Sequence, residues 1–269
     1  PDEATCAGSP VNIGGSPTGP GGSTYVWSPG TGLSSTTDAN PDANPLDSTT
    51  YVVEVTDGNG CVNTDTMVVL VNELPTVFAG NDTSFCDGGS VQLNAQGTGT
   101  FVWAPAGGLN DPNIQDPIAS PTANTTYSVT ITDGNGCQNA DIINVSIDAL
   151  PTVDAGPDLW VCPGFGELLL GSGSGTYSWS PGADLDDPNS ATPTADPATS
   201  TVYTLTVTSG NNCTASDAMT LVVNDDPPAD AGADQTICLG QQVVLGGNPS
   251  GLPGSTFNWL PGATLNDPT

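Results

Sequence analysis

The stretch TDGNGC at residues 56–61 decides how this sequence folds, because the chain repeats it. The same six letters return at residues 132–137, and TSGNNC stands at residues 208–213, so the three copies lie 76 residues apart. A hairpin turn needs positive φ angles, which Gly and Asn tolerate at little cost. The flanking residues alternate apolar and small polar side chains, as in TYSVTIT at 126–132, which predicts a strand on each side of the turn.

Two sets of aromatic residues share the 76-residue interval, which defines an internal repeat. They are Trp27, Trp103 and Trp179 in one set and Tyr51, Tyr127 and Tyr203 in the other. Trp259 follows Trp179 by 80 residues, because the last copy carries a four-residue insertion. We predict an N-terminally truncated repeat at 1–75, whole repeats at 76–151 and 152–227, and a C-terminally truncated repeat at 228–269.

Each repeat is predicted to be a small all-β sandwich. In every copy the Trp stands two positions after another aromatic residue, on the same face of a strand, where it would fill the core between two sheets. We predict that the core holds all four of these Trp residues and the three periodic Tyr residues. No stretch has helical periodicity, and 34 Gly and 25 Pro punctuate the chain too often for long helices.

The cysteines also follow the repeat. Each whole repeat contains two, one in a C-x-G motif and one directly after the hairpin turn. With no His and no C-x-x-C motif for zinc, this regular placement predicts disulfides in an oxidising compartment. The cysteines predicted to form them are Cys6, Cys61, Cys86, Cys137, Cys162 and Cys213.

The pairing of these cysteines is open between two schemes. Pairing within a repeat would join Cys6 to Cys61, Cys86 to Cys137 and Cys162 to Cys213. The two positions are expected at opposite ends of a sandwich, however, and a seven-residue strand spans roughly 23 Å, whereas a disulfide needs Cα atoms within about 7 Å. In a head-to-tail array, pairing between repeats is feasible and slightly favoured, joining Cys6 to Cys137 and Cys86 to Cys213.

The charge is entirely one-sided. The chain has 29 acidic residues and no Lys, Arg or His, giving a formal net charge of −29. Such a surface repels nucleic acid and anionic lipid, so neither is expected as a partner. Cations must balance the charge, either as diffuse sodium or as bound Ca²⁺, although no cofactor is required. The candidate calcium ligands are Asp148 and Asp154, the loop group Asp184, Asp186 and Asp187, and the junction group Asp225, Asp226 and Asp230.

The residue types argue against an enzyme. Without His, Lys or Arg the chain cannot form a Ser-His or Cys-His pair, a Schiff-base lysine or a phosphate clamp. A carboxylate pair at Asp186 and Asp187 could in principle act as acid and base, but these neighbours precede a proline in a turn, where a solvated loop is favoured.

The repeat resembles a known class. AGADQTICLGQQVVL at 231–245, TFNWLPGATLNDP at 256–268 and TTYSVTITDGNGC at 125–137 are similar to the PKD-like or immunoglobulin-like tandem repeats of giant Bacteroidota surface proteins. That class includes gliding-motility adhesins and other substrates of type IX secretion. The resemblance implies an immunoglobulin-like fold and an extracellular location on the surface of a Gram-negative bacterium.

Two functions then compete. In the first, the repeats are the shaft of a large secreted adhesin or filamentous appendage. The expected partners are neighbouring repeats and, in a multi-chain appendage, other copies of the chain. In the second, they are spacers in a secreted multidomain hydrolase. The strict period and the absence of basic residues favour the shaft, because a long homogeneous array gains from regular spacing. No insertion into a membrane is expected, and the target cell or surface glycan is unknown.

Overall fold

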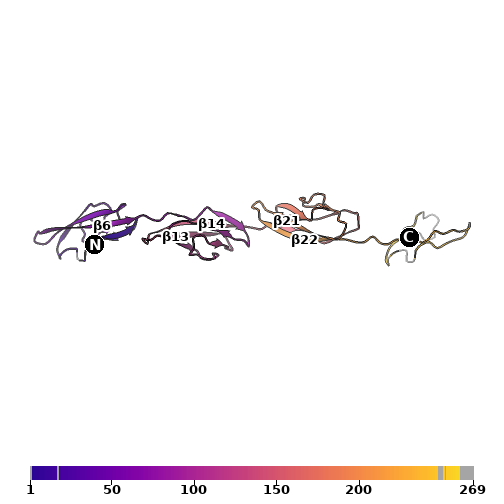
Figure 1. The fold of residues 1–269 in the computed structure, drawn as a ribbon, viewed down its shortest axis with the longest axis horizontal. Coiled ribbons are helices and arrows are strands. Elements are labelled where there is room, and N and C mark those ends of the chain that lie inside the picture. Colours follow the sequence, from indigo (N-terminus) through magenta and orange to yellow (C-terminus); the bar gives the residue numbers. More distant parts are fainter. Residues whose placement is uncertain (1, 17, 248–250, 252, 261–269) are drawn as a thin grey trace. The chain divides into compact units, whose positions relative to one another are not determined.

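The computed structural model describes residues 2–16, 18–247, 251 and 253–260. These residues contain β-strands joined by turns, and no helix, as Figure 1 shows. The chain divides into two compact units, Pro1–Ala149 and Leu150–Thr269. The first unit holds two copies of the 76-residue repeat, and the second holds the third copy and the start of the fourth.

The second repeat shows the architecture most fully. One layer is a four-stranded sheet in the order β11-β13-β14-β8, in which β8 runs parallel to β14 and the other pairs are antiparallel. Its strands are β8 (Thr83–Cys86), β11 (Thr100–Ala104), β13 (Thr125–Thr132) and β14 (Gln138–Asp148). The TDGNGC turn joins β13 to β14, as the alternating pattern predicts.

The opposite layer consists of two short antiparallel pairs, β7 with β10 and β9 with β12. These strands are β7 (Val77–Phe78), β9 (Val91–Gln92), β10 (Gln96–Gly97) and β12 (Ile118–Ala119). Two facing β-layers, with an early strand running parallel to the last one, form an immunoglobulin-like sandwich. The chain is therefore an all-β protein of tandem immunoglobulin-like repeats, which confirms the predicted fold class.

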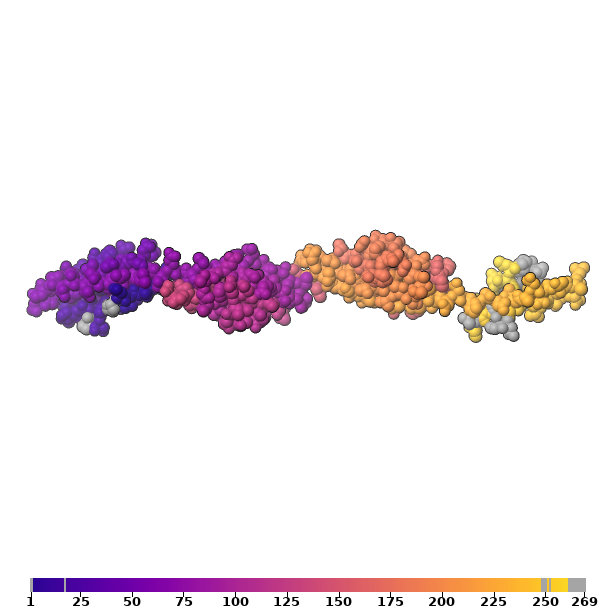
Figure 2. Space-filling model, in the orientation of Figure 1, coloured from indigo at the N-terminus to yellow at the C-terminus, as the bar shows by residue number. Residues whose placement is uncertain are grey.

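The first and third repeats have the same four-stranded layer, in the orders β1-β6-β5-β3 and β16-β22-β21-β19. The first contains β1 (Glu3–Cys6), β2 (Val11–Asn12), β3 (Thr24–Ser28), β4 (Asp42–Ala43), β5 (Thr49–Thr56) and β6 (Val62–Asn72). The third contains β15 (Val153–Asp154), β16 (Leu159–Val161), β17 (Glu167–Leu168), β18 (Ser172–Gly173), β19 (Thr176–Ser180), β20 (Thr194–Ala195), β21 (Thr201–Thr208) and β22 (Thr214–Val223). In the space-filling view of Figure 2, the red-to-orange residues of the third repeat form one continuous body.

Each of the three repeats has its own hydrophobic core, centred on the periodic Trp and Tyr. In the second repeat Trp103 is 2% exposed and Tyr127 is fully buried. The Trp103 indole N–H donates to the carbonyl of Ile114 at 3.1 Å, so the loop that follows the strand covers the ring. The equivalent indoles of Trp27 and Trp179 also donate to a carbonyl 11 residues later.

Trp259 differs from its predicted core position. It is half-buried, and it belongs to none of the three core clusters. In the described part of the fourth copy, residues 228–247, 251 and 253–260, no strand forms. The physical reason is that the 269 residues contain no counterparts of β21 and β22 for this copy, so the sheet that would bury Trp259 has no partner strands.

The periodic Tyr residues offer a matched pair of substitutions. The Tyr127 hydroxyl donates to the Gly107 carbonyl at 2.9 Å, whereas the buried Tyr203 hydroxyl has no hydrogen-bond partner in the described structure. Tyr127→Phe is therefore expected to lower the free energy of unfolding by about 1–2 kcal/mol, and Tyr203→Phe to be neutral or slightly stabilising. Urea denaturation of both variants checks this, and equal losses would contradict it.

Candidate functional site: the cysteine hairpin

The TDGNGC hairpin is built so that its last residue is held rigidly. In the second repeat the Asp133 N–H donates to the Cys137 carbonyl at 3.0 Å, and the Gly136 N–H donates to the Asp133 carbonyl at 3.2 Å. Gly136 has a φ of 82°, in the left-handed region that residues with a Cβ rarely adopt. This explains the Gly at the fifth position of the motif.

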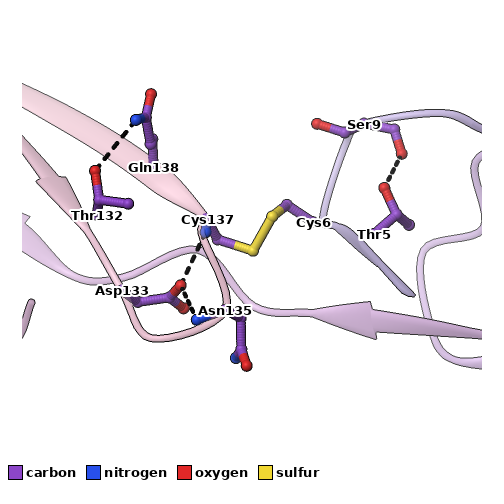
Figure 3. Close-up of a disulfide and its surroundings, with 8 residues drawn as sticks. All are labelled: Thr5, Cys6, Ser9, Thr132, Asp133, Asn135, Cys137 and Gln138. Atoms are coloured by element: carbon purple, nitrogen blue, oxygen red, sulfur yellow. Dashed lines mark hydrogen bonds between the residues drawn. A yellow bond between two sulfur atoms is a disulfide. The ribbon is translucent and has the colours of Figure 1, made fainter. Parts of the chain in front are cut away.

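The Asp133 side chain completes the turn, as Figure 3 shows. One carboxylate oxygen accepts the N–H groups of Asn135 at 2.9 Å and of Cys137 at 2.8 Å. At the base of the hairpin the Gln138 amide donates to the Thr132 hydroxyl at 3.1 Å. The Cys137 backbone is thus fixed on both sides, which presents its sulfur from a defined position.

The other two copies of the hairpin keep this geometry. In the first repeat the Asp57 carboxylate accepts from Cys61 and Asn59, and these N–H bonds, that of Cys61 foremost, lower the pKa of Asp57. In the third repeat Ser209 replaces the Asp, and its hydroxyl accepts from Cys213 N–H at 3.2 Å. Asn212 takes the place of the Gly there, with a φ of 62°.

The structure joins Cys137 to Cys6 by a disulfide, shown in Figure 3. The two residues are 131 positions apart in sequence, and their Cα atoms are 5.5 Å apart. Cys6 ends β1 of the first repeat, so the bond links the first repeat to the hairpin of the second. This is one of the two pairings between repeats that the sequence favours.

The strand register explains why the two cysteines of one repeat do not pair. Cys86 lies beside Asp148, the last residue of β14. Cys137 directly precedes the first residue of that strand. Eleven residues of extended chain separate the two ends by roughly 35 Å, far beyond the reach of about 7 Å that a disulfide allows.

The remaining cysteines divide into two groups. Cys86 and Cys213 are each disulfide-bonded. Cys61, Cys162 and Cys238 are free and exposed, which corrects the prediction that Cys61 and Cys162 form disulfides. If C-x-G cysteines bond to the hairpin of the following repeat, Cys61 needs a C-x-G one repeat earlier and Cys162 a hairpin in the fourth copy, and the 269 residues contain neither.

The predicted calcium clusters do not form. Among the residues that the structure describes, no group of three or more Asp, Glu, Cys or His side chains is placed to hold a metal ion. The aspartates instead accept local backbone N–H groups, as Asp154 does from Gly156 and Asp230 does from Gly232, both at 2.8 Å. The other candidates, Asp148, Asp184, Asp187, Asp225 and Asp226, likewise join no metal-binding group.

Asp186 and Asp187 show the same local role and no acid–base pair. The Asp186 carboxylate accepts the N–H of Thr194 at 2.7 Å and that of Asp187 at 2.8 Å. The pKa of Asp186 is lowered, chiefly by the Thr194 N–H, so this carboxyl stays ionised. Asp187 accepts from Asn189 at 3.0 Å. The sequence did not predict these contacts, because an Asp that caps a turn and an Asp that binds a metal have similar neighbours in sequence.

A carboxylate just before β1, β8 and β16 ties each of these strands to the last strand of its repeat. Asp82 accepts the backbone N–H of Asn144 at 2.9 Å and its side-chain amide at 3.0 Å. Asp2 accepts similarly from Val68, and Asp158 accepts from Thr220. Hydrogen bonds to Asn144, the backbone one foremost, lower the pKa of Asp82 below its ordinary value of 3.8.

Asp82→Asn is expected to destabilise the second repeat in a pH-dependent way. Because the folded pKa is depressed, the stabilisation by Asp82 is fully present above the ordinary carboxyl pKa and is lost as pH falls through the folded value. The difference in free energy of unfolding between wild type and Asp82→Asn should therefore be constant near neutral pH and should disappear at acid pH. Urea denaturation over a pH series tests this. A difference in free energy of unfolding as large at acid pH as at neutral pH would show that ionisation of Asp82 does not contribute to stability.

Comparisons with known proteins identify no family for the chain. No family description matches it, and no curated protein is a significant relative. Among solved structures, domains I67–I69 of titin share 10% identity at a TM-score of 0.38, covering 83% of this chain and 95% of that one. Extracellular domains 3–5 of Drosophila OTK share 10% identity at a TM-score of 0.35, with the same coverage.

The eight N-terminal immunoglobulin domains of the Down syndrome cell adhesion molecule share 13% identity at a TM-score of 0.43, covering 83% of this chain and 36% of that one. At these scores the likenesses carry no argument about function. Nor does any described residue belong to a helix long and apolar enough to cross a membrane.

Proposed function

We propose that these repeats form the shaft of a large secreted cell-surface adhesin or filamentous appendage, which holds an attachment structure outside the cell. The observation that carries the proposal is the Cys6–Cys137 disulfide, because it makes a covalent link across a repeat boundary. Cys86 and Cys213 occupy the equivalent positions one repeat further on, and we propose that they form the next link. The role is non-catalytic and extracellular, where disulfides persist.

A shaft under tension benefits from this arrangement. A force that unfolds a repeat would lengthen the chain by the number of residues released, but the disulfide closes a loop of 131 residues and keeps it from extending. At a reach of about 3.3–3.6 Å per residue, this withholds about 450 Å of length. The net charge of −29, with no basic side chain, also opposes collapse of the array onto itself.

Single-molecule extension of the chain tests the mechanical part of the proposal. The reduced chain is expected to reach a contour length greater by about 450 Å than that of a chain holding only the Cys6–Cys137 bond. Both chains carry Cys86→Ser and Cys213→Ser, because these two cysteines are also disulfide-bonded. The matched control adds Cys137→Ser to this background and should extend fully without reductant. Equal lengths with and without the bond would contradict a role in bearing load.

Deletion of residues 1–269 in the producing cell separates the shaft from the spacer. Loss of attachment, with secreted hydrolase activities unchanged, is expected for a shaft. Unchanged attachment with a lost or mislocalised hydrolase activity would instead identify the repeats as spacers.

A further inference from the structure

The second repeat contains a groove that no ionisable side chain lines. It has a volume of about 280 Å³ and lies between the segment of β9 and β10 on one side and the bend between β7 and β8 on the other. Buried Leu93 and Ile143 form its floor. A groove without a carboxylate does not attract a cation, and the net charge of −29 on the chain repels anions. The groove therefore suits an uncharged ligand.

One wall of the groove is a row of amide side chains. Residues 91–97 form an extended segment in which buried and exposed side chains alternate. The alternation places Gln92, Asn94 and Gln96 on one exposed face, spread over about 13 Å at roughly 3.3 Å per residue. On the opposite wall Asn81 adds a fourth amide. Amides from two segments thus converge on one groove.

An aromatic ring borders the amide row. Phe78 lies directly opposite Gln96 in the β7–β10 pair, so the two side chains are neighbours on one face of the layer. The Phe78 side chain is 41% exposed, although it belongs to a strand of the sandwich. The groove therefore combines an accessible apolar ring with several polar groups, which is the usual composition of a site for a small ligand.

The four groove amides, Asn81, Gln92, Asn94 and Gln96, keep hydrogen-bonding capacity for a ligand. The Gln92 amide nitrogen donates to the carbonyl of Asp116, and the Asn94 nitrogen donates to the carbonyl of Gln92 at 3.3 Å. These bonds orient the two side chains and leave their oxygens as acceptors. Among the described residues, none forms a hydrogen bond with the side chain of Asn81 or Gln96.

The fold does not require amides at these positions. In the third repeat Leu168 stands at the position of Gln92 and is 47% exposed. Leu170 stands at the position of Asn94 and is 50% exposed. The four-stranded layer and its two short partner pairs form in both repeats. Packing of the sandwich therefore does not explain the amide row of the second repeat.

We propose that this groove binds a neutral oligosaccharide. Sugar hydroxyls both donate and accept hydrogen bonds, as amide side chains do, and the C–H face of a sugar ring packs against the exposed ring of Phe78. A peptide fits less well, because extended peptides bind through an unpaired sheet edge, whereas β9 and β10 are already paired with β12 and β7. The inference goes beyond the shaft role, which a chain without a sugar site could equally serve.

Nuclear magnetic resonance of the side-chain amides in the isotope-labelled chain tests this proposal. Neutral hexasaccharides of glucose, galactose, mannose or N-acetylglucosamine are added in turn, and at least one should shift the resonances of the four groove amides saturably. A hexasaccharide of galacturonic acid, which carries carboxylates, should leave them unchanged. A site with a Kd of about 1 mM would be nearly full at about 10 mM ligand. The absence of any shift with every neutral probe at that concentration would overturn the proposal.

Residues taken from the third repeat provide variants that keep the fold. Asn94→Leu and Phe78→Asp introduce the side chains of Leu170 and Asp154 at their equivalent positions, and a urea midpoint close to that of wild type verifies that each variant is folded. Each should weaken binding at least about tenfold, because the first removes an amide and the second removes the ring. Gln242→Leu, at an exposed amide outside the groove, should leave binding unchanged.

Two further outcomes would contradict a sugar site in this groove. A probe that binds wild type, Asn94→Leu and Phe78→Asp equally would show that the sugar binds elsewhere. A neutral peptide of Ser and Thr that shifts the groove amides more strongly than any hexasaccharide would show that the groove binds peptide. Neither result would affect the shaft proposal, which rests on the disulfide between repeats.

Discussion

Cys6→Ser is expected to lower the free energy of unfolding of the first unit by up to about 5 kcal/mol. The Cys6–Cys137 bond closes a loop of 131 residues, and the entropy that such a cross-link removes from the unfolded chain grows with loop length. Cys137→Ser should have the same effect, since each variant removes the same bond. Urea denaturation followed by Trp fluorescence measures the loss.

Cys61→Ser is the matched control for this loss. Cys61 stands at the same place in the same hairpin motif as Cys137, but it is free and exposed. Its replacement should change the free energy of unfolding by less than about 0.5 kcal/mol, as is usual for surface substitutions. If Cys6→Ser and Cys61→Ser behaved alike, the disulfide would contribute nothing measurable to the stability of the unit.

Much of the fold could be predicted because each decisive feature is local in sequence. The hairpin follows from Gly136 and the alternation before it, and the core position of Trp103 follows from its place two residues after Phe101. Because the motif and the periodic aromatic residues occur in three copies, each of these features is observed three times. The pairing of strands that lie far apart in sequence was harder to predict. Nothing in the residues of β8 and β14 indicates that these strands pair in parallel.

The candidate site was predictable only in part, for two physical reasons. A cysteine forms a disulfide only if its partner lies within reach, so Cys61 and Cys162 are free although they repeat the positions of bonded cysteines. An aspartate in a turn satisfies the nearest N–H groups first, so Asp186 caps its own loop. Residue type alone predicts neither outcome. The bonding of a cysteine depends on whether the fold brings a second cysteine within reach, and the role of an aspartate depends on which backbone N–H groups lie nearest.

Trp103→Ala is expected to cost about 3–5 kcal/mol, the largest loss from any single core side chain of the second repeat. The ring is 2% exposed, and its removal leaves a cavity between the two layers of the sandwich. The indole hydrogen bond to Ile114 is also lost, which frees the loop that covers the core. Thermal and urea denaturation of the variant measure the change.

Trp160→Ala provides the control, because the same residue type occupies an opposite environment. Trp160 lies on β16 and is 64% exposed, where the neighbouring repeats have Ser84 and Thr236. Its removal leaves no cavity, so the expected change is within about 0.5 kcal/mol. A large loss at Trp160 would mean that another surface covers this ring, whereas a small loss at Trp103 would mean that the sandwich collapses around the cavity.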